Sequence, residues 1–189
     1  MTAEYILNRE IDRVLAVLTP GNALVVRTML ETGLRVGDVL NLRAGQLKNS
    51  FWVTESKTGK RRHVGLTTAL IDEIWKEARR YIPKWQKDVP HKDLYIFPSP
   101  TNWRNARTRQ AVWKDVKRAA TAFRMPRNVG THTFRKVYAV ELLAKYGSFA
   151  RVQKALNHTD PSVTAIYAMA DKLVTDGKMR RAFGGKRRR

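Results

Sequence analysis

The sequence predicts a mainly α-helical domain with a small antiparallel β-sheet. Apolar residues recur at helical spacing in several separate segments, and two short strand-like runs flank a Lys-Thr-Gly-Lys turn. Of the 189 residues, 43% are hydrophobic and 28% are charged, so the chain can bury a sizeable core. We expect one domain over residues 1–175, followed by a basic tail over residues 176–189.

The first helices are predicted from apolar periodicity and from signals at their ends. Asn8 is expected to cap the first helix, and residues 19–22 (Thr-Pro-Gly-Asn) are expected to form a turn. The second helix should end at Gly33, because glycine is a common C-cap. A short third helix is expected over residues 37–42.

The chain then changes to a strand pattern before it returns to helices. Residues 50–54 and 61–66 are expected to pair as a hairpin around a turn at residues 57–60. Thr67 or Thr68 is expected to cap the next helix. Further helices are expected over residues 68–81, 107–123, 131–147, 149–156 and 162–169.

The charge of the chain indicates a polyanionic partner. It carries 37 Lys and Arg residues against 16 Asp and Glu residues, a formal net charge of +21. Such a charge makes the compact state repel itself and is typical of nucleic-acid binding, with an anionic membrane surface as the main alternative. The absence of cysteine excludes disulfides, Cys-based zinc sites and thiol catalysis. With acidic residues near the start and no apolar run of about 20 residues, we expect a cytoplasmic protein.

Four segments contain the side chains needed for phosphoryl transfer without a metal. They are Thr32 to Leu40 with Arg35, the turn with Lys57, Thr131 to Arg135 with His132, and Leu156-Asn157-His158 followed by Tyr167. Two guanidiniums can clamp the oxygens of a phosphodiester, and a Lys or His can protonate the departing oxygen. A tyrosine can attack once its proton is removed.

Each of these residues also has an ordinary structural explanation. Arg35 is typical of a surface arginine after a helix-ending glycine, and Arg135 can pair with a carboxylate. Lys57 can be a solvated turn residue, and His158 can cap a helix. Tyr167 lies in an apolar pattern that is compatible with core packing. The joint pattern is therefore more informative than any one residue.

In this order and spacing, the pattern resembles the catalytic domain of tyrosine recombinases of the phage integrase family, over about residues 8–171. Arg35 and Asp38 match the family's T-G-L-R-x-x-E/D segment, and Lys57 matches its hairpin lysine. The family's H-x-x-R segment, its L-G-H segment and its nucleophile are matched by His132, Arg135, His158 and Tyr167.

The resemblance implies a site-specific recombinase that cuts and rejoins DNA through a 3′-phosphotyrosyl bond, for integration, excision or inversion of a mobile or phage element. In this reading Tyr167 attacks, Lys57 protonates the leaving oxygen and His132 accepts the tyrosine proton. No metal or other cofactor is implied. The implied partners are double-stranded DNA, further protomers in a tetramer on that DNA, and accessory DNA-bending proteins, in the nucleoid of a bacterial or phage-infected cell.

The sequence departs from the family pattern in two respects. Asn157 stands where glycine is usual, and Lys136 stands where histidine is commoner. Most members also carry an N-terminal core-binding domain, whereas catalytic-domain sequence begins almost at Met1 here. We therefore expect either a minimal single-domain recombinase or a piece of a longer one.

Basic residues in loops and at helix starts are the candidate DNA contacts: Lys48, Lys60, Arg61, Arg62, Arg104, Arg107 and Arg109. Two other functions keep the same fold. A type IB topoisomerase-like enzyme would nick and close DNA without a partner site, and a DNA-binding accessory protein would not require Tyr167 or His158.

Overall fold

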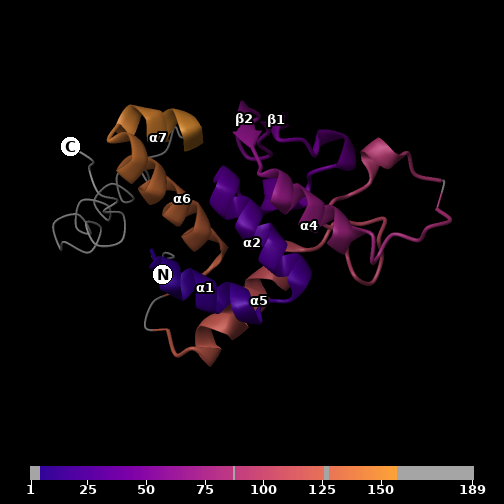
Figure 1. Cartoon of the computed structure of the whole chain (residues 1–189), viewed down its shortest axis with the longest axis horizontal. Helices are drawn as coiled ribbons and strands as arrows, with labels where there is room; N and C mark the ends of the chain where they lie inside the picture. Colours follow the sequence, from indigo (N-terminus) through magenta and orange to yellow (C-terminus); the bar gives the residue numbers. More distant parts are fainter. Residues whose placement is uncertain (1–4, 87, 126–127, 157–189) are drawn as a thin grey trace.

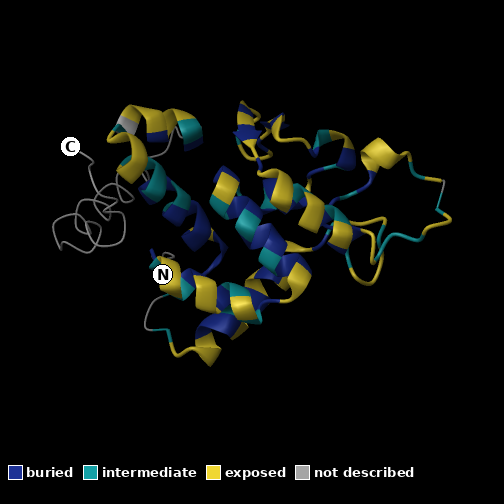
Figure 2. Ribbon diagram, in the orientation of Figure 1, coloured by how far each residue is buried: buried dark blue, intermediate teal, exposed yellow. Residues whose placement is uncertain are grey.

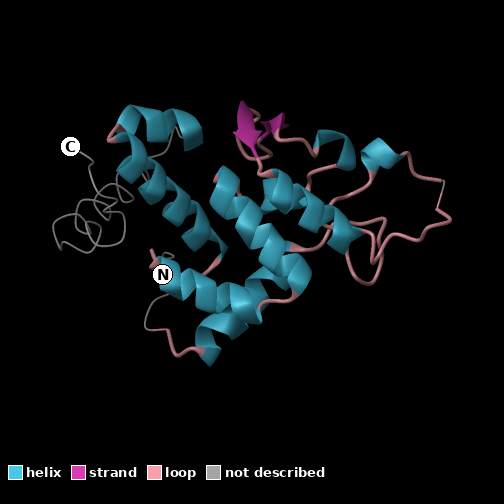
Figure 3. Cartoon of the chain, in the orientation of Figure 1, coloured by secondary structure: helices cyan, strands magenta, loops and turns pink. Residues whose placement is uncertain are grey.

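The computed structural model describes residues 5–86, 88–125 and 128–156 (Figures 1 and 3). Its α-helices are α1 (Asn8–Val17), α2 (Pro20–Thr32), α3 (Val36–Leu40), α4 (Thr68–Ala78), α5 (Arg109–Ala122), α6 (Thr131–Tyr146) and α7 (Phe149–Leu156). Two strands, β1 (Ser50–Thr54) and β2 (Arg61–Gly65), and two 3₁₀ turns, η1 (Ala44–Gln46) and η2 (His91–Asp93), complete the described elements. The predicted class, mainly α with a small antiparallel sheet, is confirmed.

Helix α2 is the centre of the core. It contacts α1, α3, α4, α5, α6 and β2, and Figure 1 shows it between α6 and α4. Most of its circumference is buried, including Val25, Thr28 and Met29, whereas on the remaining side Arg27 is half-buried and Glu31 is exposed (Figure 2). A helix that is buried over most of its surface packs against neighbours in several directions. The end of α2 is therefore held by several neighbours, and the candidate site residues described below gather there.

The two strands form the predicted antiparallel hairpin. Val53 lies opposite Arg62, and Phe51 lies opposite Val64. Burial alternates along both strands, so one face of the hairpin packs on the core and the other faces solvent. Arg62 is on the inward face, in a position where an apolar residue is usual.

Two predicted helix starts are wrong. Asn8 is the first helical residue rather than the cap: Leu7 is the N-cap, and the Glu10 carboxylate accepts a hydrogen bond from the Leu7 N–H at 2.6 Å. The predicted turn at residues 19–22 is instead the first turn of α2, which begins at Pro20. Proline suits this position because its fixed φ is already helical and a first-turn N–H needs no helical acceptor.

Helix α2 ends at Gly33, as predicted, and two separate features of the structure favour glycine at this position. Gly33 has a φ of 64°, in the left-handed region, and its N–H donates to the Met29 carbonyl at 2.7 Å. A Cβ atom at this position would lie 2.2 Å from Cδ1 of Tyr138 on α6. The close contact brings α6 directly against the end of α2.

The remaining boundaries differ from prediction by a few residues. The third helix covers Val36–Leu40, the fourth ends at Ala78, and the fifth begins at Arg109, with Thr108 as its cap. Thr67 caps α4, as one of the two predicted alternatives. The helix predicted over residues 162–169 and the tail over residues 176–189 lie outside the described residues. Within the described residues, no helix is both long enough and apolar enough to span a membrane.

Candidate active site

Two of the predicted arginines meet at one buried carboxylate. Arg35 lies in the connection between α2 and α3, and Arg135 lies one turn into α6. Nη1 of Arg35 donates to Oε2 of Glu55 at 2.7 Å, and Nη1 of Arg135 lies 3.7 Å from Oε1 of the same residue. Glu55, at the end of the β1 segment, is fully buried. Arg35 and Arg135, which are 100 positions apart in the sequence, thus lie beside the same carboxylate.

The end of α2 fixes a second side of this cluster through main-chain oxygens. Nη1 of Arg135 and Nη1 of Arg62 both donate to the carbonyl of Gly33, at 2.8 and 3.2 Å, and Arg62 also bonds the carbonyl of Thr32. Carbonyls at a helix C-terminus lack helical donors and carry partial negative charge, so they attract cations. The two guanidiniums therefore supply the hydrogen-bond donors that the last carbonyls of α2 lack.

Lys57 lies in the hairpin turn between two anchored neighbours. Before it, the N–H of Ser56 donates to Oδ1 of buried Asp38 at 2.9 Å. After it, the hydroxyl of Thr58 donates to Oε2 of Glu55 at 3.1 Å. The turn is thus tied to α3 on one side and to the arginine cluster on the other, while Lys57 itself is exposed.

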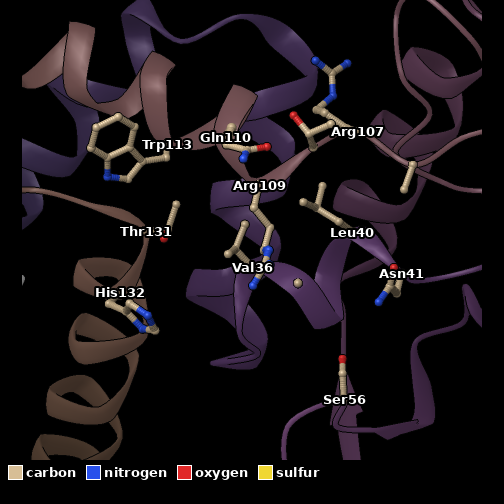
Figure 4. Close-up of a pocket in the computed structure, with 13 residues that line it drawn as sticks. Val36, Leu40, Asn41, Ser56, Arg107, Arg109, Gln110, Trp113, Thr131 and His132 are labelled. Atoms are coloured by element: carbon tan, nitrogen blue, oxygen red, sulfur yellow. The ribbon is translucent and has the colours of Figure 1, made fainter.

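His132 is in the first turn of α6 and lines an open cleft of about 800 Å³. The cleft is bounded by α3, by Ser56 of the hairpin, and by the starts of α5 and α6, with Arg109 and Trp113 on its α5 side (Figure 4). Partial burial is the largest cause that lowers the pKa of His132, and the positive charges of Arg135 and Arg35 lower it further. His132 is therefore neutral at neutral pH and able to accept a proton.

Burial also lowers the pKa of Arg135, to about 10. The positive charges of Arg35 and Arg62 lower this pKa further, and the negative charge of Glu55 raises it. Arg135 remains protonated at neutral pH. Its Nη2 donates to the carbonyl of Leu156 at 2.7 Å, so Arg135 links the end of α7 to the end of α2.

The predicted site residues divide into two groups. Arg35, Lys57, His132 and Arg135 lie around the end of α2 and the hairpin turn. His158 and Tyr167 lie outside the described residues. In the described part of the chain, no group of three or more His, Cys, Asp or Glu residues could hold a metal ion.

The candidate DNA contacts also divide. Arg62 and Arg107 are buried, with 5% and 6% exposure, so the prediction that they contact DNA phosphates is corrected. Arg62 binds the carbonyls at the end of α2, and Arg107 fills the space over Gly21, with its Nη1 donating to Asn22. The other five are exposed: Lys48, Lys60, Arg61, Arg104 and Arg109. Of these, Arg104 pairs with Asp88.

Sequence reasoning missed Glu55, although the strand pattern contained a signal. Phe51 and Val53 point inward, and the alternation of a strand places Glu55 on the same side. On the partner strand Arg62 shares the inward side with Val64. Opposite charges on the buried face of one hairpin predict a buried ion pair. In the structure, Nη1 of Arg62 lies 3.8 Å from Oε1 of Glu55.

Sequence relatives show the family of the chain. The chain matches the phage integrase family over residues 4–173. It is 30% identical over 158 residues to the probable integrase/recombinase YoeC of Bacillus subtilis, covering 82% of this chain and 81% of that protein. It is 31% identical over 147 residues to the tyrosine recombinase XerD of Lacticaseibacillus casei, covering 76% of this chain and 48% of that protein. The chain thus spans about half the length of this XerD.

Solved structures share the fold at lower identity. The XerH site-specific recombinase in a post-cleavage complex with its difH substrate has a TM-score of 0.67 and 23% identity, over 95% of this chain and 53% of that one. The catalytic domain of bacteriophage HP1 integrase has a TM-score of 0.61 and 19% identity, over 96% of this chain and 95% of that one. A λ integrase tetramer bound to a Holliday junction has a TM-score of 0.65 and 17% identity, over 88% of this chain and 48% of that one.

The fold, the sequence match and the clustered arginines all agree. The family match covers most of the chain, and Arg35 and Arg135, which match the family's two arginines, converge on one buried carboxylate. The chain therefore belongs to the phage integrase family, and its fold is that of a tyrosine recombinase catalytic domain.

Proposed function

We propose that this protein is a site-specific DNA recombinase that cuts and rejoins strands through a 3′-phosphotyrosyl bond to Tyr167. The observation that carries the proposal is the convergence of Arg35 and Arg135 on Glu55, beside the hairpin that bears Lys57. Two guanidiniums held in one place suit the two non-bridging oxygens of a phosphodiester. We assign the catalytic domain to residues 1–175 and a basic tail to residues 176–189.

The proposed reaction has one bond made for each bond broken. The phenolic oxygen of Tyr167 attacks the phosphorus as its proton passes to neutral His132. The bond from phosphorus to the 5′-oxygen breaks, and Lys57 donates a proton to that oxygen. Arg35, Arg135 and His158 stabilise the charge on the phosphoryl oxygens. A 5′-hydroxyl from another strand reverses these steps, so the proposal requires no metal, nucleotide or other cofactor.

Connectivity supports the place of His158 in this scheme. Arg135 holds the carbonyl of Leu156, and His158 follows Leu156 by two residues in the sequence. Two residues of extended chain span about 7 Å. Attachment at Leu156 thus limits how far His158 can lie from the arginine cluster.

Trapping of the covalent intermediate tests the proposal. A DNA duplex with a nick next to the cleavage point loses its short 5′-hydroxyl fragment after cleavage, so the enzyme remains attached. We expect a protein–DNA adduct that survives denaturing electrophoresis with the unaltered chain and is absent with Tyr167→Phe. Tyr146→Phe is the control, because Tyr146 is an exposed tyrosine at the end of α6. An adduct that persists in Tyr167→Phe would contradict the assignment.

The arginine clamp has its own test. In Arg35→Ala or Arg135→Ala we expect cleavage to fall by roughly two orders of magnitude or more, the scale of loss of one transition-state donor. Arg79→Ala is a suitable control, because Arg79 is an exposed cation at the C-cap of α4. Single-turnover cleavage of the nicked duplex measures the effect, and cleavage at the unaltered rate in either clamp variant would contradict the role.

We also propose double-stranded DNA and further copies of this chain as partners. The net charge of +21 and the basic residues that remain exposed support DNA binding. The λ integrase tetramer on a Holliday junction supports assembly on DNA, and accessory DNA-bending proteins are further proposed partners.

We propose integration, excision or inversion of a mobile or phage element in the nucleoid. Recombination between two sites, rather than relaxation of supercoils at one, would distinguish this from a topoisomerase.

A further inference from the structure

The position of Glu55 indicates a specific part in the reaction, an inference that rests on the proposed recombinase function. Glu55 is fully buried, and its carboxylate lies within 4 Å of three guanidinium groups. A buried carboxylate is costly unless it is paired, and three clustered cations repel one another without an anion between them. The carboxylate and the arginines therefore stabilise each other.

The contacts of Glu55 differ between its two oxygens. Oε2 accepts hydrogen bonds from Nη1 of Arg35 at 2.7 Å and from the hydroxyl of Thr58 at 3.1 Å. Oε1 accepts none and lies 3.7–3.8 Å from Nη1 of Arg135 and of Arg62. Glu55 is thus hydrogen-bonded to Arg35, whereas its interaction with Arg135 and Arg62 is a longer-range electrostatic attraction.

Arg35 depends on Glu55 more than the other two arginines do. Arg135 and Arg62 are each held by main-chain carbonyls. For Arg35, the bond to Glu55 is the one side-chain hydrogen bond found in the described part of the chain. Because this bond uses Nη1, the donors on Nε and Nη2 are left for a phosphate, which a planar guanidinium can bind through two parallel hydrogen bonds.

We propose that Glu55 is the positioning residue for Arg35: its carboxylate fixes the guanidinium so that the remaining donors face the scissile phosphate. Loss of Glu55 then leaves Arg35 both unheld and repelled by Arg62 and Arg135. The chemical step, rather than DNA affinity, is expected to suffer, because removal of one negative charge from a basic protein does not weaken its attraction for DNA.

The central variant is Glu55→Gln, which keeps the size of the side chain and removes its charge. We expect single-turnover cleavage at saturating DNA to fall roughly ten- to a hundredfold, the scale found when a partner that orients a reacting group is lost. Glu55→Asp, which keeps the charge on a shorter stem, should recover part of the rate. The matched control is Glu77→Gln, because Glu77 on α4 is also a buried glutamate and its carboxylate accepts hydrogen bonds from Arg80 and Tyr81, which follow that helix.

A methylphosphonate at the cleavage point separates positioning from a general loss of folding. This linkage lacks one non-bridging oxygen and its negative charge, so it depends less on an arginine clamp. The ratio of cleavage on phosphate to cleavage on methylphosphonate is measured within one variant and does not depend on the folded fraction. We expect Glu55→Gln to lower this ratio, and we expect the same direction of change in Arg35→Ala.

Two results would overturn the inference. One is cleavage by Glu55→Gln at the unaltered rate. The other is a deficit of equal size on both linkages, which would mean that Glu55 supports only folding. Failure of the proposed function is recognised separately, because the unaltered chain would then form no adduct, or the adduct would persist in Tyr167→Phe.

Discussion

At the residue scale, the electrostatics of His132 decide what it can do in the reaction. Its pKa is lowered from the ordinary value of 6.5 by partial burial and by the cations beside it. A neutral imidazole accepts a proton, whereas an imidazolium cannot. The arginine cluster that we propose to bind the phosphate therefore also keeps His132 in the form that a general base requires.

This arrangement predicts a pH dependence with a definite direction. Because the pKa of His132 is lowered, the base remains active as pH falls to 6.5, and the acidic limb of the cleavage rate should have its midpoint below 6.5. In His132→Gln that limb should disappear, and the rate at neutral pH should fall roughly a hundredfold. Single-turnover rates over a pH series measure both, and a midpoint above 6.5 would argue against His132 as the base.

At the element scale, the contact between the end of α2 and α6 sets the position of the site. Gly33 combines a left-handed backbone, close approach to Tyr138, and a carbonyl that binds two arginines. Arg35 follows two residues later, and Arg135 lies on the helix that Gly33 touches. A change in the packing here would move both arginines relative to each other.

Gly33→Ala is therefore expected to be strongly destabilising. We expect a loss of at least about 2 kcal/mol in the free energy of unfolding, since backbone strain at positive φ adds to the clash with Tyr138. Gly59→Ala in the hairpin turn is a close control: its φ is 65°, but a Cβ there meets nothing within 4 Å, so strain alone costs about 1 kcal/mol. Urea unfolding measures both, and equal losses would show that the Tyr138 contact is unimportant.

Local signals in the sequence were sufficient for many elements of the fold. The hairpin follows from alternating strands around a Gly-containing turn, and the end of α2 follows from Gly33. The start of α2 was wrong because the proline suits the first position of a helix as well as a turn. Helix periodicity and caps act over a few residues, which is why these features can be read from the sequence.

The errors at the site have a different cause. Arg62 and Arg107 have the same side chain as the exposed arginines, and their burial depends on acceptors far away in the sequence, at Gly33 and Asn22. The role of Glu55 likewise depends on its contacts with Arg35 and Arg135, which are distant in the sequence, so it could not be predicted from local patterns. Resemblance to a family predicted the reacting residues, but it did not predict the groups that hold Arg35 and Arg135.

At the scale of the whole molecule, the excess of basic residues is expected to control DNA affinity through salt. Each phosphate neutralised by a lysine or arginine releases condensed counterions, so affinity falls as salt rises. The exposed cation Arg109 lines the cleft that also contains His132, so we expect Arg109 to contact a DNA phosphate near the proposed site (Figure 4). Arg62 and Arg107 lie inside the protein and should contribute little to this dependence.

Arg109→Ala is expected to reduce the slope of log affinity against log salt by about 1. Arg27→Ala is the control, because Arg27 already pairs with Glu73 at the surface. Filter-binding or fluorescence titrations across a series of salt concentrations give both slopes. An unchanged slope for Arg109→Ala would mean that this side of the cleft does not contact phosphate.

One consequence follows from the carbonyl of Gly33, which accepts hydrogen bonds from Arg62 and Arg135. This acceptor is a peptide oxygen, and every amino acid supplies the same atom. A scan of side-chain replacements would therefore overlook it as a ligand, whereas an ester in place of the Gly33–Leu34 amide would weaken that oxygen as an acceptor and expose its contribution. The positions of Arg135 and Arg62 are thus set in part by the backbone, and this acceptor remains when side chains around it are substituted.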